Sequence, residues 1–383
     1  MSGSSDFQRR MPEASRDLRR PVSVLQRWHI DWPLLLGLVL ITVYGLIVLY
    51  SASGQDFYYV KRQSVFFVIA YGAMFTVAQI RLHVFEYWAP WFYLAGIILL
   101  AMVLVMGVGA KGAQRWLSIG GFRFQPSEGL KLAVPIMIAA YLAKRLLPPR
   151  FSHIVISLAL IGVPALLIMR QPDLGTSLLI AASGLLVLFF AGLRWRYIAG
   201  AVGILLASAW PIWMFVLHGY QRQRILTMFN PEADKLGAGW NIIQSKTAIG
   251  SGGIYGKGWL NGTQSHLNFL PESHTDFIIA VLAEEFGLLG VLALLSMYVL
   301  LIGRGLWIAL TAQNTFSRLL AGSITFTFFI YIFVNIGMVS GLLPVVGVPL
   351  PLVSSGGTSI VTLMVGFGIL MAIGTERRRV SIG

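Results

Sequence analysis

Long, uninterrupted apolar stretches are the feature that most constrains this chain. A helix needs about 20 predominantly apolar residues to cross a hydrocarbon core of roughly 30 Å, where no unpaired backbone group is tolerated. The sequence holds ten such stretches, at residues 32–50, 63–80, 89–109, 128–147, 153–170, 175–193, 197–218, 276–303, 317–341 and 356–374. We therefore predict an all-α polytopic membrane protein with ten transmembrane helices and a large extracytoplasmic loop, 219–275, between the seventh and eighth helices.

The composition agrees with a membrane protein and excludes several other classes. Of the 383 residues, 56% are hydrophobic and only 11% are charged, where an ordinary soluble domain carries about 25% charged residues. The net charge of +14 indicates contact with anionic membrane lipids in so apolar a chain, and we predict no nucleic-acid partner. Cys is absent and the six histidines show no metal-ligand spacing, so we predict no metal site and no cofactor, and leave a divalent cation open.

The distribution of Lys and Arg orients the chain. Positive charge collects on the cytoplasmic side of membrane proteins, and residues 1–30, ahead of the first apolar stretch, carry six arginines. We predict a disordered basic cytoplasmic tail at 1–30, a transmembrane domain at 31–375 and a cytoplasmic C-terminal tail at 376–383. Both termini are then expected in the cytoplasm.

Most of the cations expected on the opposite side lie in two loops, 110–127 and 219–275. Long loops tolerate charge, so this clustering has a plain alternative explanation. The functional interpretation is a cationic vestibule for an anionic substrate at the outer leaflet. The loop 219–275 is also too long for a plain connection, and loops of that length are commonly functional or carry structure of their own.

A glycine-rich segment at 250–258 superficially resembles a phosphate-binding loop. Ser251 stands where a Walker A motif needs Gly, and Gly258 stands where Ser or Thr should bind Mg²⁺, so ATP use is not expected. Two interpretations stay open: a turn whose amides approach a lipid pyrophosphate, and a merely flexible turn.

Asp276, at the start of the eighth apolar stretch, is the candidate catalytic residue. Ser273 and Asp276 fit a Ser-x-x-Asp capping box, which would be a purely structural role. In a helical projection from Asp276, however, Glu284 and several small residues share its face, and ionisable residues in a membrane usually face the bundle interior or a water-filled cavity. We favour a functional role for Asp276, leave Glu284 between structural pairing and function, and expect Glu285 to be structural.

A second constellation joins Glu128 and Lys131, at i,i+3 on the start of the fourth stretch, where they can pair on one face. The pair either neutralises itself within the membrane or lies in a cavity wall and shifts the pKa of a nearby acid such as Asp276. Trp116, in the preceding loop, is either an interfacial anchor or a platform for substrate.

Residues 341–355 are apolar and uncharged, and Pro344, Pro349 and Pro351 exclude a continuous helix there. Such backbone survives at membrane depth only against protein or a polar cavity. The segment is therefore either a re-entrant loop facing the site or an ordinary interfacial connection.

Taken together, seven ordered blocks of this chain resemble the signature blocks of the SEDS family, which takes in RodA, FtsW and the sporulation homologues. The blocks are residues 111–116, 125–128, 171–176, 220–224, 244–246, 270–276 and 349–354. The resemblance runs from about residue 30 to 375, and segments 262–265 and 337–349 resemble the RodA branch more than the FtsW branch. Ser355 departs from the pattern, because RodA-like chains more often carry Tyr at that position.

This resemblance implies a peptidoglycan glycosyltransferase of the bacterial cytoplasmic (inner) membrane, acting in cell-wall biogenesis. Such an enzyme polymerises lipid II into glycan strands during cell elongation and cell-shape maintenance, and it releases undecaprenyl pyrophosphate. The resemblance also implies a class B penicillin-binding protein, a transpeptidase, as partner, together with elongation proteins such as MreC and MreD.

Site roles follow from the same resemblance and from the residue chemistry. We predict Asp276 as the general base on the acceptor hydroxyl, with Glu128 and Lys131 holding and tuning it. The other supporting residues are Arg115 and Trp116, and the predicted substrate-binding residues are Arg222, Arg224, Gln244, Ser245, Lys246, Glu272 and His274. Arg222, Arg224 and Lys246 would offset charge on the departing pyrophosphate.

Two other functions fit parts of the pattern. Ten helices, a Pro-broken segment and buried acids also describe a lipid II flippase, and an inert membrane scaffold is a third interpretation. The clustering of cations in exported loops favours the enzyme over both.

Overall fold

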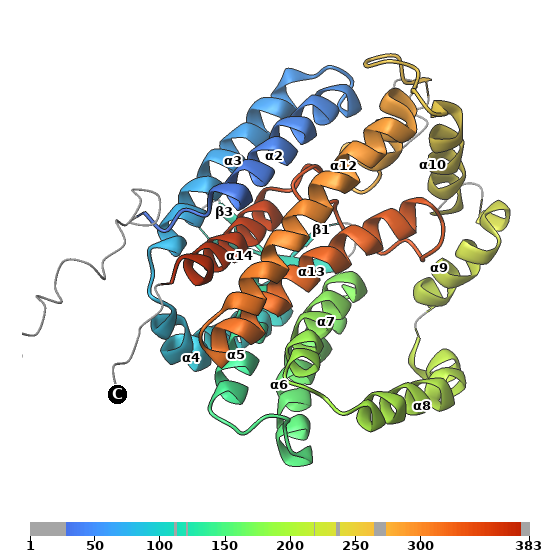
Figure 1. Cartoon of the computed structure of the whole chain (residues 1–383). Helices are drawn as coiled ribbons and strands as arrows, with labels where there is room; N and C mark the ends of the chain where they lie inside the picture. Colours follow the sequence, from blue (N-terminus) through green and yellow to red (C-terminus); the bar gives the residue numbers. More distant parts are fainter. Residues whose placement is uncertain are drawn as a thin grey trace, which may run out of the picture.

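The computed structural model describes residues 28–110, 113–119, 122–217, 219–234, 238–263 and 273–376, and it is a bundle of long helices (Figure 1). The helices that coincide with the predicted apolar stretches are α2 (Trp32–Ala52), α3 (Phe57–Ala78), α4 (Leu82–Met106), α5 (Pro126–Ala143), α6 (Phe151–Met169), α7 (Leu174–Phe190), α8 (Trp195–Pro211), α12 (Ile278–Thr311), α13 (Thr315–Val339) and α14 (Gly357–Thr375).

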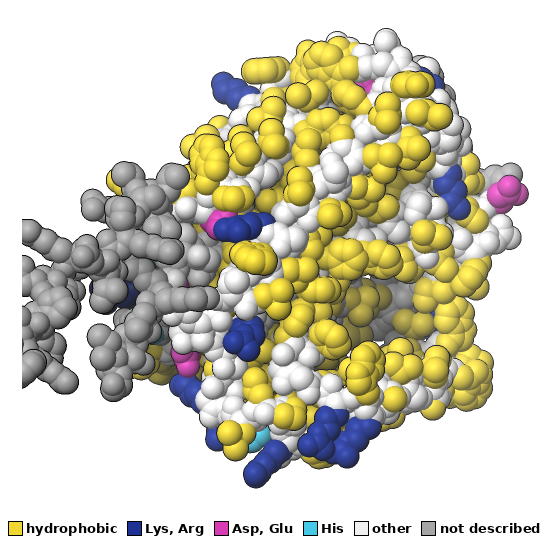
Figure 2. All heavy atoms as spheres, viewed as in Figure 1, with side chains coloured by type: hydrophobic (Ala, Val, Ile, Leu, Met, Phe, Trp, Pro, Cys, Tyr) yellow, Lys and Arg dark blue, Asp and Glu magenta, His cyan; other side chains and the backbone are white. Residues whose placement is uncertain are grey.

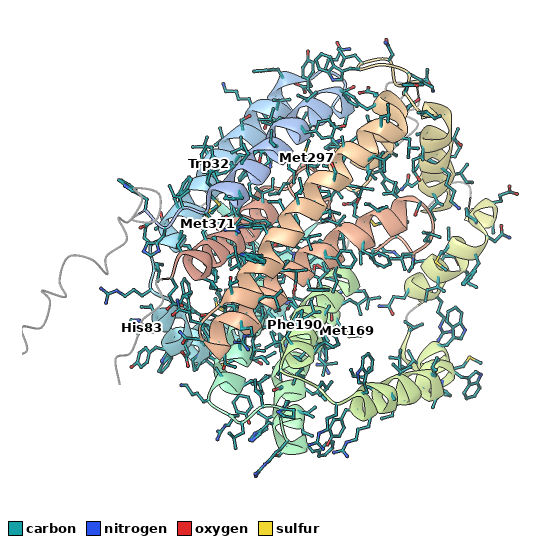
Figure 3. The ribbon with its side chains drawn as sticks, viewed as in Figure 1. Trp32, His83, Met169, Phe190, Met297 and Met371 are labelled. Carbon is teal, nitrogen blue, oxygen red and sulfur yellow. The ribbon has the colours of Figure 1, made fainter. Side chains whose placement is uncertain are left out.

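The predicted class, an all-α protein with several membrane spans, is confirmed. Within the described residues, seven helices are long and apolar enough to cross a membrane, and α7 is a shorter apolar helix. Figure 2 shows a face covered mainly by hydrophobic side chains, as contact with lipid requires. Side chains fill the space between neighbouring helices: Phe190 of α7 meets Phe326 of α13 with ring centroids 5.2 Å apart, and Met371 of α14 is fully buried (Figure 3).

The segment between α4 and α5, predicted as an exported loop, carries a small antiparallel sheet. Its strands, in spatial order, are β1 (Val108–Ala110), β2 (Ala113–Ile119) and β3 (Phe122–Phe124). Trp116 lies opposite Val108, and Leu117 lies opposite Phe124. Because β2 also contacts α4 and α5, the sheet holds Arg115 and Trp116 at one end of the bundle.

The long loop 219–275 has structure of its own, as the sequence suggested. It contains α9 (Gly219–Phe229), the 3-10 helix η2 (Pro231–Asp234) and α10 (Ala238–Gly252). Helix α10 packs on α12 and α13, and buried Ser245 donates a hydrogen bond to the carbonyl of Val339 at 2.9 Å. Helix α8 continues into the π-helix η1 (Ile212–Val216), buries none of its own described residues, and lies away from the bundle (Figure 1).

Helix α12 begins later than the capping-box interpretation requires. Its N-cap is Phe277, with no side-chain cap bond among the described residues, and Asp276 precedes it in a turn spanning residues 273–277. Gly287 interrupts the helix with φ +65 and ψ −162. The capping box is therefore wrong, and the helical projection from Asp276 does not apply, because Asp276 lies outside the helix.

The glycine-rich segment 252–258 docks on this interruption of α12. The amides of Leu288 and Leu289 donate to carbonyls of the segment, and the carbonyls of Glu284 and Glu285 accept from its amides, at 3.0 to 3.2 Å. These bonds satisfy the backbone groups that the broken helix leaves without internal partners. The segment thus binds the backbone of α12. It is neither the turn around a lipid pyrophosphate nor the merely flexible turn that the sequence left open.

Both acids near the interruption are buried and paired. Glu284 meets Lys257 Nζ at 2.7 Å and accepts from the amide of Thr263 at 2.8 Å. Glu285 accepts from the hydroxyl of Ser51 on α2. Structural pairing therefore accounts for Glu284, and Glu285 is structural as expected.

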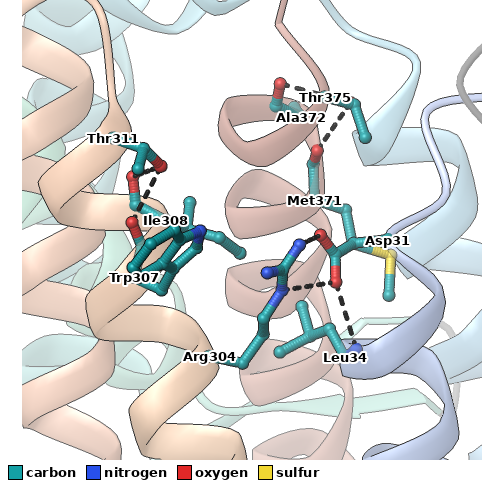
Figure 4. A network of polar contacts seen from close by, with 9 residues as sticks. All are labelled: Asp31, Leu34, Arg304, Trp307, Ile308, Thr311, Met371, Ala372 and Thr375. Atoms are coloured by element: carbon teal, nitrogen blue, oxygen red, sulfur yellow. Dashed lines mark hydrogen bonds and ion pairs between the residues drawn. The ribbon is translucent and has the colours of Figure 1, made fainter.

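At the other end of α12, an ion pair joins the bundle. Asp31 caps α2 through the amide of Leu34 at 3.1 Å and receives Arg304 Nη2 at 2.6 Å (Figure 4). His29 Nδ1 lies 2.9 Å from Thr375 Oγ1 of α14. The first and last described segments of the chain therefore meet at the same end of the bundle.

We predict that Gly256→Ala destabilises the protein. A Cβ at Gly256, where φ is +80, would overlap the carbonyl of Glu285 in the docked segment. Overpacking of this kind costs about 1–3 kcal/mol, which a lowered thermal midpoint in detergent would report. Gly250→Ala is the matched control, since nothing lies within 4 Å of its Cβ position. Equal midpoints for the two variants would show that the docked segment does not depend on Gly256.

Candidate functional site

A cavity of about 500 Å³ lies where α3, α5, α7 and α14 begin. This volume is in the range of about 300–1,000 Å³ typical of small-molecule sites. Its charged lining comprises three cations and two acids: Arg62, Arg115, Lys131, Glu128 and Asp173. Residues 347–349 of the Pro-broken segment, together with residues 356–359 that follow it, form another wall.

The electrostatics of the cavity favour an anion. Besides the excess of cations, the N-terminal ends of three helices reach its wall, with N-caps at Gln125 of α5, Asp173 of α7 and Gly356 of α14. Helix N-termini present unpaired amides and the positive end of the helix dipole. A phosphate group is the kind of ligand that such a wall can hold.

The predicted pair of Glu128 and Lys131 is confirmed and lies in this wall. Lys131 Nζ is 2.7 Å from Glu128 Oε1, and both side chains are more than nine-tenths buried. The ammonium also lies 5.2 Å from the centre of the Tyr331 ring, on α13. Within the described part of the chain, Glu128 Oε2 has no hydrogen-bond partner. The pair is neutral as a whole, and it fixes the Lys131 ammonium and the Glu128 carboxylate in the cavity wall.

Arg115 is fixed by the start of α7. Asp173 caps that helix by accepting from the amide and hydroxyl of Thr176 at 3.2 and 2.9 Å. Arg115 Nε lies 3.6 Å from Asp173 Oδ2, while its Nη2 donates to the carbonyl of Pro172 at 2.7 Å. Its side chain is 36% exposed, so this held guanidinium is still accessible from the cavity that it lines.

Asp276 lies beside the same cavity. A Cβ built on Gly347 would lie 3.4 Å from Asp276 Oδ2, and Gly347 itself lines the cavity with φ +75. Asp276 is not itself among the residues that line the cavity, but its carboxylate lies against Gly347, which is. His274, in the same turn, packs its ring against Tyr59 with centroids 4.9 Å apart.

The remaining predicted substrate-binding residues lie on other elements. Arg222 and Arg224 are on α9, and Gln244, Ser245 and Lys246 are on α10. As far as the described residues define it, the lining of the cavity includes none of these five. Glu272, like Lys111 of the resemblance blocks, lies outside the described residues.

Several polar lining residues were missed by the sequence reasoning. Asp173 had a signal, since it belongs to the block 171–176 and stands directly before an apolar stretch. Arg62 directly precedes the second predicted stretch, and a cation at that place is typical of the flank of any membrane helix. Tyr331 carries no local signal, because a Tyr within an apolar stretch is typical of any membrane helix.

Metal binding finds no support in the part of the chain that the structure describes. No group of three or more His, Asp or Glu side chains is close enough there to hold an ion. Four of the five charged groups of the cavity form two ion pairs, Arg115 with Asp173 and Lys131 with Glu128, and Arg115 also bonds to backbone.

Fold and cavity together define a polytopic membrane protein with a cationic site at one end of its helix bundle. The sequence profile of the FtsW/RodA/SpoVE family, described as cell cycle protein, matches residues 31–379. The chain belongs to this family, and the resemblance predicted from its sequence blocks is confirmed.

Relatives and solved structures cover nearly the whole chain. "Peptidoglycan glycosyltransferase MrdB" of Escherichia coli is 55% identical over 354 residues, which is 92% of this chain and 95% of that protein. "Probable peptidoglycan glycosyltransferase FtsW" of Trichlorobacter lovleyi is 37% identical over 372 residues, 93% and 95% of the two chains.

Among solved structures, the Rod shape determining protein RodA of Thermus thermophilus is similar with a TM-score of 0.69 and 28% identity, covering 91% of this chain and 98% of that one. A structure described as "Structural coordination of polymerization and crosslinking by a peptidoglycan synthase complex" has a TM-score of 0.80 and 30% identity, covering 90% and 97%. At these identities the likeness supports the family as well as the fold.

The buried pair yields a prediction about stability. Lys131→Met leaves the Glu128 carboxylate buried without its partner, and breaking a buried pair in this way costs about 3–5 kcal/mol. The double variant Glu128→Gln/Lys131→Met removes both charges, so we expect it to be more stable than Lys131→Met alone. Thermal unfolding in detergent measures the difference, and additive losses would contradict the pairing.

Proposed function

We propose that this chain is a peptidoglycan glycosyltransferase that polymerises lipid II into glycan strands during cell elongation. The observation that carries the proposal is a cationic cavity directly beside Asp276, in a chain of the FtsW/RodA/SpoVE family. Lipid II carries a pyrophosphate, which suits the excess of positive charge in that cavity. The 55% identical relative is named for the same activity.

The reaction joins two lipid-linked saccharides. Asp276 takes the proton of the acceptor 4-hydroxyl, and the freed oxygen attacks the anomeric carbon of the donor sugar. A new glycosidic bond forms as the bond from that carbon to the pyrophosphate oxygen breaks. Undecaprenyl pyrophosphate leaves with the bonding electron pair.

The cavity cations stabilise this leaving group. Arg62, Arg115 and Lys131 line the cavity, and two of them are held in place by Asp173 and Glu128. Preorganised cations aimed at a developing negative charge lower the barrier without reorganising during the reaction. In this proposal Glu128 acts on Lys131, and Lys131 acts on the pyrophosphate, in place of the holding and tuning of Asp276 that the sequence predicted for the pair. Trp116, which also lines the cavity, offers an aromatic surface to the sugar or the lipid.

The residues on α9 and α10 stay predicted substrate contacts. They are Arg222, Arg224, Gln244, Ser245 and Lys246. Glu272 and His274, which precede Asp276 in the sequence, stay predicted substrate contacts as well. In this proposal, however, the cavity cations take over the compensation of charge on the departing pyrophosphate that the sequence assigned to Arg222, Arg224 and Lys246. In this proposal the cavity set holds the pyrophosphate during the reaction, which is a different task from guiding the lipid toward it.

We further propose that ten helices cross the bacterial cytoplasmic (inner) membrane with the cavity on the outer side. His29, just before α2, and Thr375, at the end of α14, meet at one end of the bundle, as an even number of crossings requires. The cavity lies at the start of α3, and only a short connection separates α3 from the end of α2. The contact between His29 and Thr375 lies at the opposite end of α2. The length of α2, about 30 Å, therefore separates the cavity from the end of the bundle where His29 and Thr375 meet. The predicted tails at 1–30 and 376–383 would then be cytoplasmic.

A class B penicillin-binding protein is the partner that we propose. Support comes from the structural likeness to a synthase complex described as coordinating polymerization and crosslinking. MreC and MreD stay predictions. The absence of a cofactor and of a nucleic-acid partner also stays a prediction. Whether a divalent cation takes part is left open, as it was from the sequence.

Polymerisation of labelled lipid II by the full chain with its class B partner tests the function. We expect long glycan strands from the wild type and none from Asp276→Asn, because the amide keeps the size of the side chain and removes the base. Binding of lipid II should be retained in this variant. Strands from a folded Asp276→Asn protein would exclude Asp276 as the base, and transfer of lipid II across liposomes without new glycosidic bonds would favour a flippase.

Neutralising single cations distinguishes the role of the cavity cations from that of the cations on α9 and α10. We expect Arg62→Gln or Arg115→Gln to raise the KM for lipid II or lower kcat about tenfold, since a hydrogen bond to a charged group is worth about 1.5–3 kcal/mol. Arg224→Gln, outside the cavity lining, should change turnover much less. Steady-state polymerisation rates measure this, and the reverse order of effects would place the pyrophosphate on α9 and α10.

A further inference from the structure

The segment between α13 and α14, residues 341–356, is irregular backbone whose second half, from Val348 to Ser354, is largely buried in the bundle, and we refer to residues 341–356 as the inter-helix segment. Three of its carbonyls accept hydrogen bonds from buried side chains of three different helices. Asn335 of α13 donates to Val348 at 2.7 Å, Tyr298 of α12 to Pro351 at 2.6 Å, and Gln63 of α3 to Ser354 at 3.0 Å. The segment is therefore fixed from several sides.

The same region holds the turn that contains Asp276. Its last three carbonyls before Phe277 accept in succession. His274 accepts from the amide of Ser355 at 3.0 Å, Thr275 from the hydroxyl of Ser354 at 2.5 Å, and Asp276 from Asn335 Nδ2 at 2.9 Å. Helix α12 begins only at Ile278, so the carbonyls of the turn have no helical hydrogen bonds of their own. The bonds from Ser355, Ser354 and Asn335 satisfy them instead.

The chemistry of the two donor side chains is specific. Asn335 uses its amide group twice, for Asp276 and for Val348, and is fully buried. The Ser354 hydroxyl donates to Thr275 and accepts from the amide of Leu350 at 2.8 Å, with only 1% of the residue exposed. Neither an apolar side chain nor a carboxylate at position 335 could replace these bonds.

We propose that Asn335 and Ser354 are positioning residues that hold Asp276 in reach of the acceptor hydroxyl. The inference rests on the proposed function and adds to it how the base is placed. The inter-helix segment contacts Asp276 on one side and lines the cavity through Gly347 and Val348 on the other, so it fixes the distance between base and substrate. A base must approach its proton within about 2.6–3.2 Å, and a displacement of about 1 Å can cost a hundredfold in rate.

A purely structural role makes a different prediction. If these bonds only satisfied buried carbonyls, their loss would lower stability and leave the turnover of the folded enzyme unchanged. Ser323 offers a matched control, because it is fully buried on α13 and donates to the carbonyl of Ser183 at 2.7 Å, away from the cavity lining. Ser323→Ala therefore removes a similar bond without touching Asp276.

The experiment compares Ser354→Ala, Ser354→Thr, Asn335→Asp and Ser323→Ala in the full chain with its class B partner. We expect Ser354→Ala and Asn335→Asp to lower kcat for polymerisation at least about tenfold, with an unchanged KM for lipid II. Ser354→Thr keeps the hydroxyl and should restore kcat, and Ser323→Ala should resemble the wild type. A kcat for Ser354→Ala equal to that of Ser323→Ala, or an effect on KM alone, would overturn the proposal.

Hydrogen–deuterium exchange gives a second readout that does not need turnover. We expect faster exchange in peptides covering residues 273–280 for Ser354→Ala and Asn335→Asp, and no change for Ser323→Ala. Unchanged exchange in all variants would overturn the proposal. A wild-type complex that makes no strands would instead overturn the proposed function, and the assignment of positioning residues with it.

Discussion

Backbone that leaves a helix inside an apolar bundle must find its hydrogen-bond partners within the protein, because lipid offers none. This constraint governs two places in the molecule. At Gly287 the helix α12 breaks, and the glycine-rich segment 252–258 supplies the missing backbone bonds. In the inter-helix segment 341–356, buried Asn335, Tyr298 and Gln63 supply them instead.

Between these two places lies the turn that carries Asp276. One side of the turn is bonded to the inter-helix segment and to Asn335, and the other side leads into the short first part of α12, which ends at the docked glycine segment. The irregular backbone therefore has a function beyond connecting helices. It places an acid beside a cavity whose cations are themselves fixed, Lys131 by Glu128 and Arg115 by Asp173.

The sequence predicted the helices well, because apolar stretches of membrane-spanning length have few alternative structures. It also predicted the Glu128–Lys131 pair, since i,i+3 spacing brings two side chains together on any helix. The capping box at Ser273 failed because the partners of that turn, Asn335 and Ser354, come from residues far along the chain. Tertiary contacts of this kind leave no local pattern, and for the same reason the loop cations of α9 and α10 could not be separated from those of the cavity.

The most direct test of this account is a cryo-EM structure of the chain in complex with its class B partner and bound lipid II. The account predicts pyrophosphate density between Arg62, Arg115 and Lys131, with a sugar hydroxyl approaching the Asp276 carboxylate. Pyrophosphate density along α9 and α10, at Arg224 and Lys246, with an empty cavity beside Asp276, would contradict it.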